Sequence, residues 1–340
     1  MQALDKDFLK ALEKIQYGKN YTVEDAALVL EAEREVSAAL FEAADRVREQ
    51  VFGKGVYLRG IIEFSNHCQK NCHYCGIRAA NKINRYRMPQ EEIIEAARHI
   101  KNAGIGTVVL QSGEDPWWNP ERMVQLIKNL KDMAGITITL SIGERDFQEY
   151  ALFKKAGADR FLLKIETTSE KIFSAVHPDD QLSQRMKCSK WLGEIGYMNG
   201  SGCIIGLPGQ TATDIASDIL WFKDMKMDMI GIGPFIPAQN TPLANLAPGS
   251  TFMTLKAVAL TRLICQKAFL PATTALETLE DEGQLKALKA GANVIMLNFT
   301  PPQYKKDYNI YNNKKAIGLE NALKTIERAG RFLQMEVQNK

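Results

Sequence analysis

Eight short apolar runs rich in β-branched residues recur along the chain, and segments with helical periodicity separate them. This alternation constrains the fold most, because strands that alternate with helices form a parallel sheet. Eight such units over ~240 residues predict a (β/α)8 TIM barrel. An open doubly wound sheet is the alternative, although no GxGxxG follows the first run. The runs are 57–64, 106–112, 136–142, 160–166, 202–207, 229–235, 271–276 and 293–299.

Helical sequence flanks the predicted barrel at both ends. Glu24 and Asp25 open an alanine-rich stretch whose apolar residues recur every three or four positions, as in a helix packed on a larger body. The chain after the last run contains a polar loop followed by a closing helix. We therefore expect an N-terminal helical segment (1–52), a barrel (53–305), and a C-terminal loop and helix that pack on it (306–340).

The charge balance excludes some partners. The 340 residues include 43 Lys and Arg against 40 Asp and Glu, a formal net charge of +3. That value is too small to indicate a nucleic-acid or membrane-surface partner. No apolar run approaches the ~18 residues of a membrane span, and the first residues lack the apolar core of a secretion signal. We expect a cytoplasmic protein with neither a nucleic-acid nor a membrane partner.

Three of the six cysteines, Cys68, Cys72 and Cys75, fall within one short loop at the end of the first predicted strand. Barrel enzymes place their chemistry at this end of their strands. Three thiolates can hold three corners of a [4Fe–4S] cluster and leave the fourth iron open to a ligand. His67 and His73 flank the cysteines, so a structural zinc site is the alternative; zinc sites, however, commonly use CxxC rather than CxxxCxxC.

The CxxxCxxC motif, with Tyr74 before its last cysteine, resembles the radical S-adenosylmethionine (SAM) superfamily. Further stretches over about residues 57–305 resemble its HydE family of [FeFe]-hydrogenase maturases: RYRM, QSGEDP, GLPGQT, GIGPFIPAQNTPLA, PATTA and GANVIMLNFTP. Some members of that family hold an auxiliary cluster through three further cysteines near the C-terminus. This chain has no cysteine after Cys265, so we expect no second cluster of that kind.

The resemblance implies a radical SAM enzyme with a [4Fe–4S] cluster on Cys68, Cys72 and Cys75 and with SAM as cofactor. Reductive cleavage of SAM yields a 5′-deoxyadenosyl radical, which would act on a small cysteine-bearing iron carbonyl/cyanide complex inside the barrel. Transient contacts with other hydrogenase maturation proteins and with an electron donor are implied as well. The alternative is a radical SAM enzyme of the biotin synthase or methylornithine synthase group that acts on an amino acid.

The resemblance also implies the cofactor contacts. Ser112, Gly113 and Glu114 follow the second strand and correspond to a motif that binds the amino group of SAM; the alternative is a plain turn. Glu166 corresponds to a partner of the ribose or amino group, and Arg185 to the arginine that meets the carboxylate. The predicted cofactor site comprises Tyr74, Ser112, Gly113, Glu114, Glu166, Arg185, Gly206 and Ile236.

A second set of residues is expected to line a substrate cavity: Arg160, Lys164, Thr273, Thr274 and Tyr304. Arg160 and Lys164 correspond to two arginines of an anion pocket in the family, and lysine offers a point charge instead of a planar fork. A salt bridge near the strand start is the alternative for Arg160. Thr273 and Thr274 are successive, so at most one faces inward in a regular strand.

Overall fold

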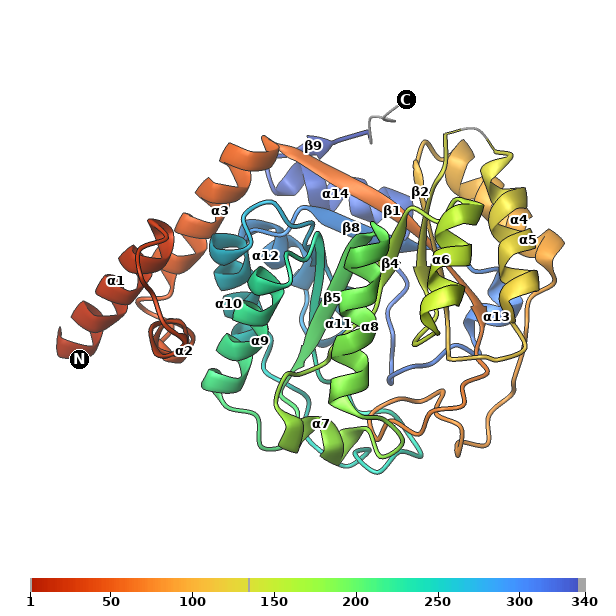
Figure 1. Cartoon of the computed structure of the whole chain (residues 1–340). Coiled ribbons are helices and arrows are strands. Elements are labelled where there is room, and N and C mark those ends of the chain that lie inside the picture. Colours follow the sequence, from red (N-terminus) through yellow and green to blue (C-terminus); the bar gives the residue numbers. More distant parts are fainter. Residues whose placement is uncertain (1, 134, 336–340) are drawn as a thin grey trace.

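Eight parallel strands form a nearly closed barrel in the computed structural model, which describes residues 2–133 and 135–335 (Figure 1). The sheet order, β6-β5-β4-β3-β2-β1-β8-β7, follows the chain without the reversal of an open doubly wound sheet. The predicted (β/α)8 barrel is therefore confirmed. Its strands are β1 (Gly55–Ser65), β2 (Thr107–Ser112), β3 (Thr137–Ser141), β4 (Arg160–Leu162), β5 (Met198–Ile205), β6 (Met229–Pro234), β7 (Pro271–Ala272) and β8 (Val294–Asn298).

Two strands are shorter than the sequence predicts. The fourth run was expected to span 160–166, but β4 ends at Leu162, and Glu166 adopts a left-handed backbone with φ of 64°. The seventh run was expected to span 271–276, but β7 ends at Ala272 and a helix begins at Thr274. A parallel bridge between Met229, the first residue of β6, and Phe269, just before β7, links the two outer strands of the sheet at their starts.

Helices connect the strands and cover the outside of the barrel. Two of them begin with clear local signals: Asn119 caps a helix that has Pro120 at its first turn, and Thr211 forms a capping box with Asp214. The connecting helices are α4 (Gln90–Asn102), α5 (Pro120–Lys131), α6 (Phe147–Ala156), α7 (Glu170–Val176), α8 (Leu182–Ile195), α9 (Ala212–Asp224), α10 (Thr251–Ile264), α11 (Thr274–Leu279) and α12 (Gly283–Lys289).

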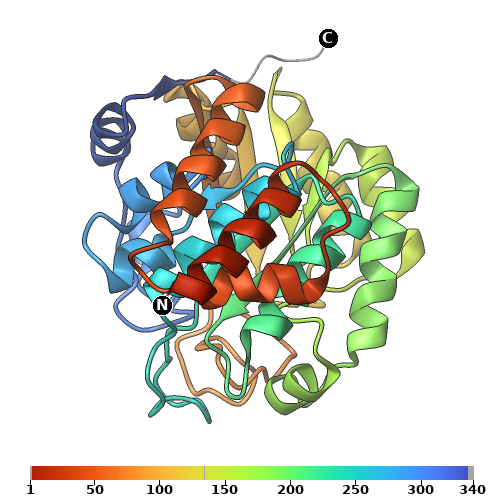
Figure 2. The same ribbon diagram turned by 90° about the vertical axis from the view of Figure 1, so that its left-hand side faces the viewer.

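Additional elements lie at both ends of the chain. The N-terminal helices α1 (Gln2–Gln16), α2 (Val23–Glu31) and α3 (Ala38–Phe52) lie across α9 and α10 (Figure 2). The C-terminal part contains α13 (Pro302–Lys305), α14 (Leu319–Arg328) and a strand that the sequence did not predict, β9 (Phe332–Leu333). This strand pairs in parallel with the start of β1, so the last described segment reaches the first strand. The division into three parts stays a prediction.

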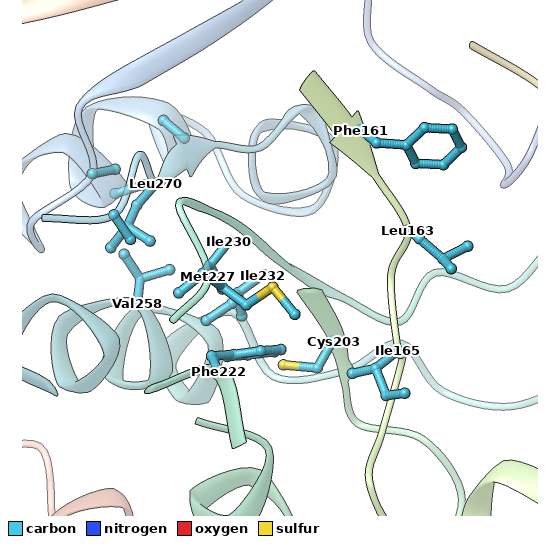
Figure 3. Packing of buried hydrophobic residues seen from close by; sticks show 14 of the residues in the cluster. Phe161, Leu163, Ile165, Cys203, Phe222, Met227, Ile230, Ile232, Val258 and Leu270 are labelled. Atoms are coloured by element: carbon cyan, nitrogen blue, oxygen red, sulfur yellow. The ribbon is translucent and has the colours of Figure 1, made fainter. Parts of the chain in front are cut away.

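Apolar side chains between the strands and the outer helices form the core (Figure 3). Phe222 of α9 and Val258 of α10 are almost completely buried against Ile230 and Ile232 of β6. Cys203 of β5 lies in the same cluster as a free thiol. Burial of each large apolar side chain contributes about 1.5–3 kcal/mol to folding, so this layer holds the strand ends rigidly in place. No helix within the described residues is long and apolar enough to cross a membrane.

Candidate active site

The loop after β1 carries all three clustered cysteines and lies at the end of the barrel where the strands terminate, close to α7 (Figure 1). The loop has no helix or strand of its own between Ser65 and the bridge at Arg87. Arg85 shapes it, because its guanidinium donates to four carbonyl oxygens of the loop. These belong to Asn66, Ile77, Arg78 and Asn81.

Two stretches that carried the family resemblance meet beside this loop. Arg87 of RYRM and Asp115 of QSGEDP form a bidentate ion pair, with N–O distances of 2.7 and 2.9 Å. The Ser65 hydroxyl at the end of β1 donates to the same carboxylate at 2.6 Å. Burial of the Asp115 carboxyl raises its pKa, but the bonds from Arg87 and Ser65 outweigh that effect and hold the pKa below its usual value. Asp115 therefore fastens both ends of the cysteine loop to the end of β2, the start through Ser65 and the far end through Arg87.

The three thiols are half-buried on one loop and influence one another. Desolvation raises the pKa of each, to about 12 for Cys75, and the neighbouring cysteines raise the pKa of Cys72 and Cys75 further. Without a metal the thiols are therefore neutral, and iron would supply the positive charge that thiolates require. Within the described parts of the chain, no three His, Cys, Asp or Glu side chains gather tightly enough for a single metal ion. Three thiols that influence one another on one loop suit a multi-iron cluster.

Gly113 allows the end of β2 to approach the cysteine loop. A Cβ atom at this position would lie 2.3 Å from the His67 carbonyl oxygen and 2.6 Å from the Cys68 Cβ. The Ser112 hydroxyl donates to the Gly113 carbonyl oxygen at 2.7 Å. The structure therefore explains the glycine by contact with the metal-binding loop itself, whereas contact with a cofactor stays a prediction.

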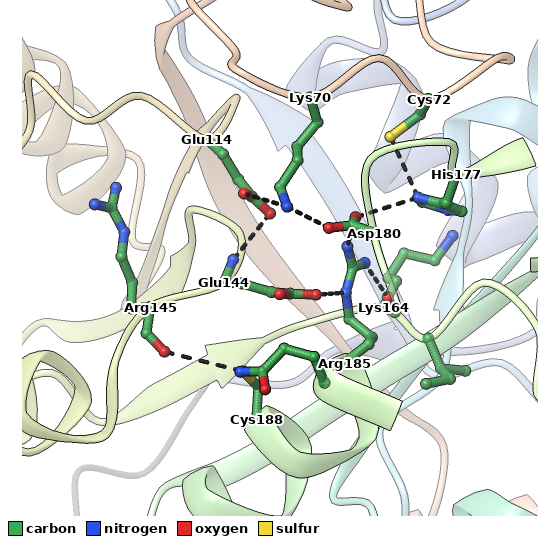
Figure 4. A network of polar contacts seen from close by, with 12 residues as sticks. Lys70, Cys72, Glu114, Glu144, Arg145, Lys164, His177, Asp180, Arg185 and Cys188 are labelled. Carbon is green, nitrogen blue, oxygen red and sulfur yellow. Dashed lines mark hydrogen bonds and ion pairs between the residues drawn. The ribbon is translucent and has the colours of Figure 1, made fainter. Parts of the chain in front are cut away.

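Arg185 of α8 lies at the centre of a network of buried charges (Figure 4). Its guanidinium bonds the carboxylates of Glu144 and Asp180, the latter at 2.7 Å, and the carbonyl oxygen of Lys164 at 3.0 Å. Burial lowers the pKa of the guanidinium, but the two carboxylates raise it above its ordinary value overall. Arg185 is therefore a permanent cation, although its side chain is only 8% exposed.

Lys70 and Glu114 extend this network toward the cysteine loop (Figure 4). Lys70 bonds Asp180 and lies 3.6 Å from Glu114 Oε2, while the backbone N–H of Glu144 donates to Glu114 Oε1 at 3.0 Å. Oε2 is buried and has no hydrogen-bond partner among the described residues. Burial raises the pKa of the Glu114 carboxyl more than these partners lower it. An additional cationic donor at Oε2 would therefore stabilise the carboxylate.

His177, which follows α7, connects the cysteine loop to the same network (Figure 4). Its Nδ1 lies 3.4 Å from the Cys72 Sγ and 3.5 Å from Asp180 Oδ2, and its Nε2 lies 3.1 Å from the Tyr74 hydroxyl. Burial lowers the pKa of the imidazole more than Asp180 raises it, so the ring is neutral. Tyr74 therefore contacts the network through a histidine.

Glu166 and Lys164 lie beyond the end of β4, where a regular strand was expected. Their side chains form an ion pair, with Lys164 Nζ 2.8 Å from Glu166 Oε2. A Cβ on Gly202 would lie 2.8 Å from Lys164 Cε, so the lysine side chain packs against the backbone of β5 at this glycine. Gly206, with φ of 94°, makes room for Gly249, and Ile236 is buried just after β6.

The residues predicted to line a substrate cavity are spread over the barrel. Arg160 lies at the first residue of β4, where its guanidinium donates to Thr107 Oγ1 at 3.3 Å. The Tyr304 hydroxyl lies 3.2 Å from Glu92 Oε1 on α4. Thr273 precedes α11, and Thr274 is the first residue of that helix, so strand alternation does not apply to this pair. A shared cavity for all five residues stays a prediction.

Sequence reasoning missed four residues of the network: the charged Lys70, Glu144 and Asp180, and the neutral His177. Lys70 lies inside the cysteine loop, and Glu144 directly follows a predicted strand, so each had a positional signal. His177 and Asp180 had none, because they come from the irregular segment between α7 and α8.

Comparison with known proteins relates this arrangement to one superfamily. The family model described as the Radical SAM superfamily matches residues 62–222. The [FeFe] hydrogenase maturase subunit HydE of Thermotoga maritima is 44% identical over 310 residues, which cover 91% of this chain and 88% of that protein. The chain belongs to the radical SAM superfamily. Within that superfamily it is a homologue of HydE.

Other radical SAM proteins are similar at greater distance. The 3-methylornithine synthase of Methanosarcina acetivorans is 33% identical over 83% of this chain and 81% of its own. The crystal structure of methylornithine synthase (PylB) superposes with a TM-score of 0.85 at 27% identity, covering 95% of this chain and 97% of that one. A structure of HydG, a maturase of the [FeFe]-hydrogenase, has a TM-score of 0.84 at 21% identity, covers 96% of this chain and 76% of that one, and shows the common fold alone.

The chain is therefore a radical SAM enzyme, and enzymes of this superfamily use a [4Fe–4S] cluster and SAM. The residues present fit both groups. Three mutually coupled thiols offer the soft ligands that a cluster requires. Glu114 Oε2, which has no hydrogen bond in the described parts of the chain, offers an acceptor for an ammonium group.

Proposed function

We propose that this chain matures the active site of an [FeFe]-hydrogenase by radical SAM chemistry. The cofactor part rests on the buried Glu114 Oε2 beside the three-cysteine loop, which has no hydrogen bond among the described residues. Among the described residues, the three carboxylates of Glu114, Glu144 and Asp180 face two cations, Lys70 and Arg185, so the network carries a formal charge of −1. SAM is a net cation and complements that charge. The 44% identity to HydE supports the maturase part.

The proposed roles follow from position. Cys68, Cys72 and Cys75 hold the cluster, Glu114 accepts from the amino group of SAM, and Arg185 faces its carboxylate. Glu166 binds the ribose or the amino group. The remaining contacts of the proposed SAM site come from Tyr74, Ser112, Gly113, Gly206 and Ile236.

In the reaction the protein binds and orients the cofactor and the substrate, and it excludes water from them. When bound, the cluster supplies one electron that cleaves SAM into methionine and a 5′-deoxyadenosyl radical. The barrel wall and the loops at the strand ends shield the reacting atoms from solvent. Thr273 Oγ1 is buried and has no hydrogen-bond partner among the described residues. It lies 3.5 Å from the Cβ position of Gly233. We therefore assign this hydroxyl as a hydrogen-bonding group for a substrate inside the barrel.

The proposed substrate is a small cysteine-bearing iron carbonyl/cyanide complex. Arg160, Lys164, Thr273, Thr274 and Tyr304 are its proposed contacts. Lys164 attracts an anionic substrate less strongly than a free lysine would, because it forms an ion pair with Glu166. We place the enzyme in the cytoplasm, in transient contact with other maturation proteins and with an electron donor.

Anaerobic reconstitution tests the metal site. We expect wild-type protein to bind about four irons and to show a reduced-cluster EPR signal that changes when SAM is added. Cys72→Ala should lose the cluster but keep the circular dichroism of the folded barrel, because the core lies elsewhere. A colourless protein with one zinc, or a Cys72→Ala variant that unfolds, would instead indicate a structural metal.

Genetics separates the maturase from an enzyme of the methylornithine synthase or biotin synthase group. Deletion of the gene in its host should abolish [FeFe]-hydrogenase activity, and the wild-type gene, but not Cys72→Ala, should restore it. Normal hydrogenase activity in the deletion strain would favour the amino-acid-directed alternative.

A further inference from the structure

His177 is held rigidly between one cysteine of the loop and the charged network (Figure 4). Its Nδ1 is 3.4 Å from the Cys72 Sγ and 3.5 Å from Asp180 Oδ2, and its Nε2 is 3.1 Å from the Tyr74 hydroxyl. The residue is 2% exposed, and its ring stacks on Phe173 with centroids 4.3 Å apart and planes 8° apart. Contacts on both edges and one face therefore set the orientation of the imidazole.

The neighbours of the ring determine which nitrogen carries the proton. A cysteine sulfur that ligates iron is a thiolate, so Cys72 can only accept a hydrogen bond. Asp180 is paired with Lys70 and Arg185 and is therefore an ionised acceptor as well. Both groups near Nδ1 thus require an Nδ1–H donor. In the neutral ring Nε2 is then an acceptor, and the Tyr74 hydroxyl donates to it.

We propose that His177 is a positioning residue of the cluster, whose Nδ1–H donates to the Cys72 sulfur and raises the reduction potential of the cluster. A donor to a ligating sulfur stabilises the reduced cluster more than the oxidised one, because the reduced cluster carries more negative charge on its sulfurs. His177 acts through Cys72 and touches no reacting atom. The inference rests on the proposed function, since it requires Cys72 to be a cluster ligand.

The same N–H also links the cluster to the proposed SAM site. Asp180, the second acceptor for Nδ1–H, is fixed by Lys70 and by Arg185 at 2.7 Å. The position of the imidazole is therefore determined by the charges that would surround the amino acid part of SAM. Both acceptors, Asp180 and the Cys72 sulfur, attract the same Nδ1–H proton. The position of Asp180 in the network therefore affects the angle of the hydrogen bond to the sulfur.

The test is the midpoint potential of the reconstituted full-length holoprotein, followed by EPR during a redox titration without SAM. His177→Phe keeps a ring on Phe173 but removes the donor, and we expect about a tenfold shift toward the oxidised cluster, ~59 mV lower for a one-electron couple. His177→Asn is the rescue variant, because its amide nitrogen is as many bonds from the backbone as Nδ1. It should recover at least half of the shift. Tyr74→Phe, which changes only the Nε2 contact, should shift the potential less than His177→Phe.

Two results would overturn the inference: an unchanged potential in His177→Phe at full iron content, or equal shifts in the Phe and Asn variants. If His177→Phe binds no iron, wild-type protein labelled with 15N-histidine decides the question. Pulsed EPR of the reduced cluster should then detect coupling to a histidine nitrogen that persists when His67 and His73 are both changed to Gln. Absence of that coupling contradicts the hydrogen bond. Wild-type protein that binds no four-iron cluster would contradict the proposed function itself.

Discussion

Buried charges at the candidate site are tolerated because each has a directed partner. Arg185 uses its three nitrogens on two carboxylates and one carbonyl oxygen, and Lys70 bonds Asp180. Unpaired, such charges would cost several kcal/mol each. Glu114 is the exception, because one of its oxygens is left without a hydrogen bond among the described residues. A polar group that lacks a hydrogen bond, within a network whose other groups are hydrogen-bonded, is typical of a binding site.

Gly113 provides a residue-scale prediction. Gly113→Ala should lower the iron content of reconstituted protein severalfold, because the new methyl group would overlap the His67 carbonyl oxygen and displace Cys68. Gly193→Ala is the matched control: it lies in α8, and the nearest atom to its Cβ position is 3.8 Å away. The control should keep full iron content and gain up to about 1 kcal/mol of stability. Iron analysis and chemical unfolding measure both effects, and equal iron content in the two variants would contradict the prediction.

At the scale of elements, outer helices position the loops that carry the site. Asp218 of α9 accepts hydrogen bonds from the backbone N–H of Thr168, and from its hydroxyl at 2.7 Å. This fastens the segment between β4 and α7 to the outer layer, and the same segment contains Glu166. Burial raises the pKa of the Asp218 carboxyl to about 7, although Thr168 opposes the shift.

Asp218 therefore makes stability depend on pH. Between its ordinary value of 3.8 and about 7 the folded protein binds the extra proton, so the free energy of unfolding falls as pH rises through this window and levels off above it. Asp218→Asn cannot ionise, so its stability relative to wild type should increase by up to a few kcal/mol from ~pH 5 to ~pH 8. Urea unfolding of both proteins at several pH values measures this. A constant difference between them would show that Asp218 does not titrate in the window.

The sequence predicted the elements better than the side-chain contacts between them. Strands buried on both faces read as continuous apolar runs, so the barrel and the end of β1 were predictable. β4 and β7 were overestimated, because apolar or β-branched residues continue past Leu162 and Ala272, where regular pairing ends. Beyond Leu162 an isolated bridge between Glu166 and Cys203 continues the pairing with β5. The contacts of His177 and Asp180 were not predictable, since they depend on how an irregular segment folds back onto a loop about 100 residues earlier.

For the whole molecule, the C-terminal segment closes against the barrel. Lys314 reaches from this segment to Glu63, a residue of β1 that is only 1% exposed, and lies 5.3 Å from the ring centroid of Tyr308. Asn298 at the end of β8 donates to the other oxygen of Glu63 at 2.8 Å. A buried ion pair thus joins the last part of the chain to the first strand.

Replacing Lys314 should release this segment. Lys314→Met leaves the Glu63 carboxylate buried without its ion-pair partner, which costs about 3–5 kcal/mol, and amide hydrogen exchange in residues 306–317 should become faster. Lys315→Met is the control, because its partner Asp281 has a side chain that is 98% exposed. The free energy of unfolding of Lys315→Met should fall by less than about 1 kcal/mol. Similar exchange rates in the two variants would show that the buried pair does not hold the segment.

The pairing of β9 with β1 has a consequence for biosynthesis. Strand β1, which leads into the loop of the three cysteines, pairs with β8 over residues 57–61 and with β9 at its start. Both strands are synthesised long after β1, so β1 acquires these two partners late in folding. The strand that leads into the cysteine loop therefore lacks two of its partners until the later parts of the barrel have been synthesised.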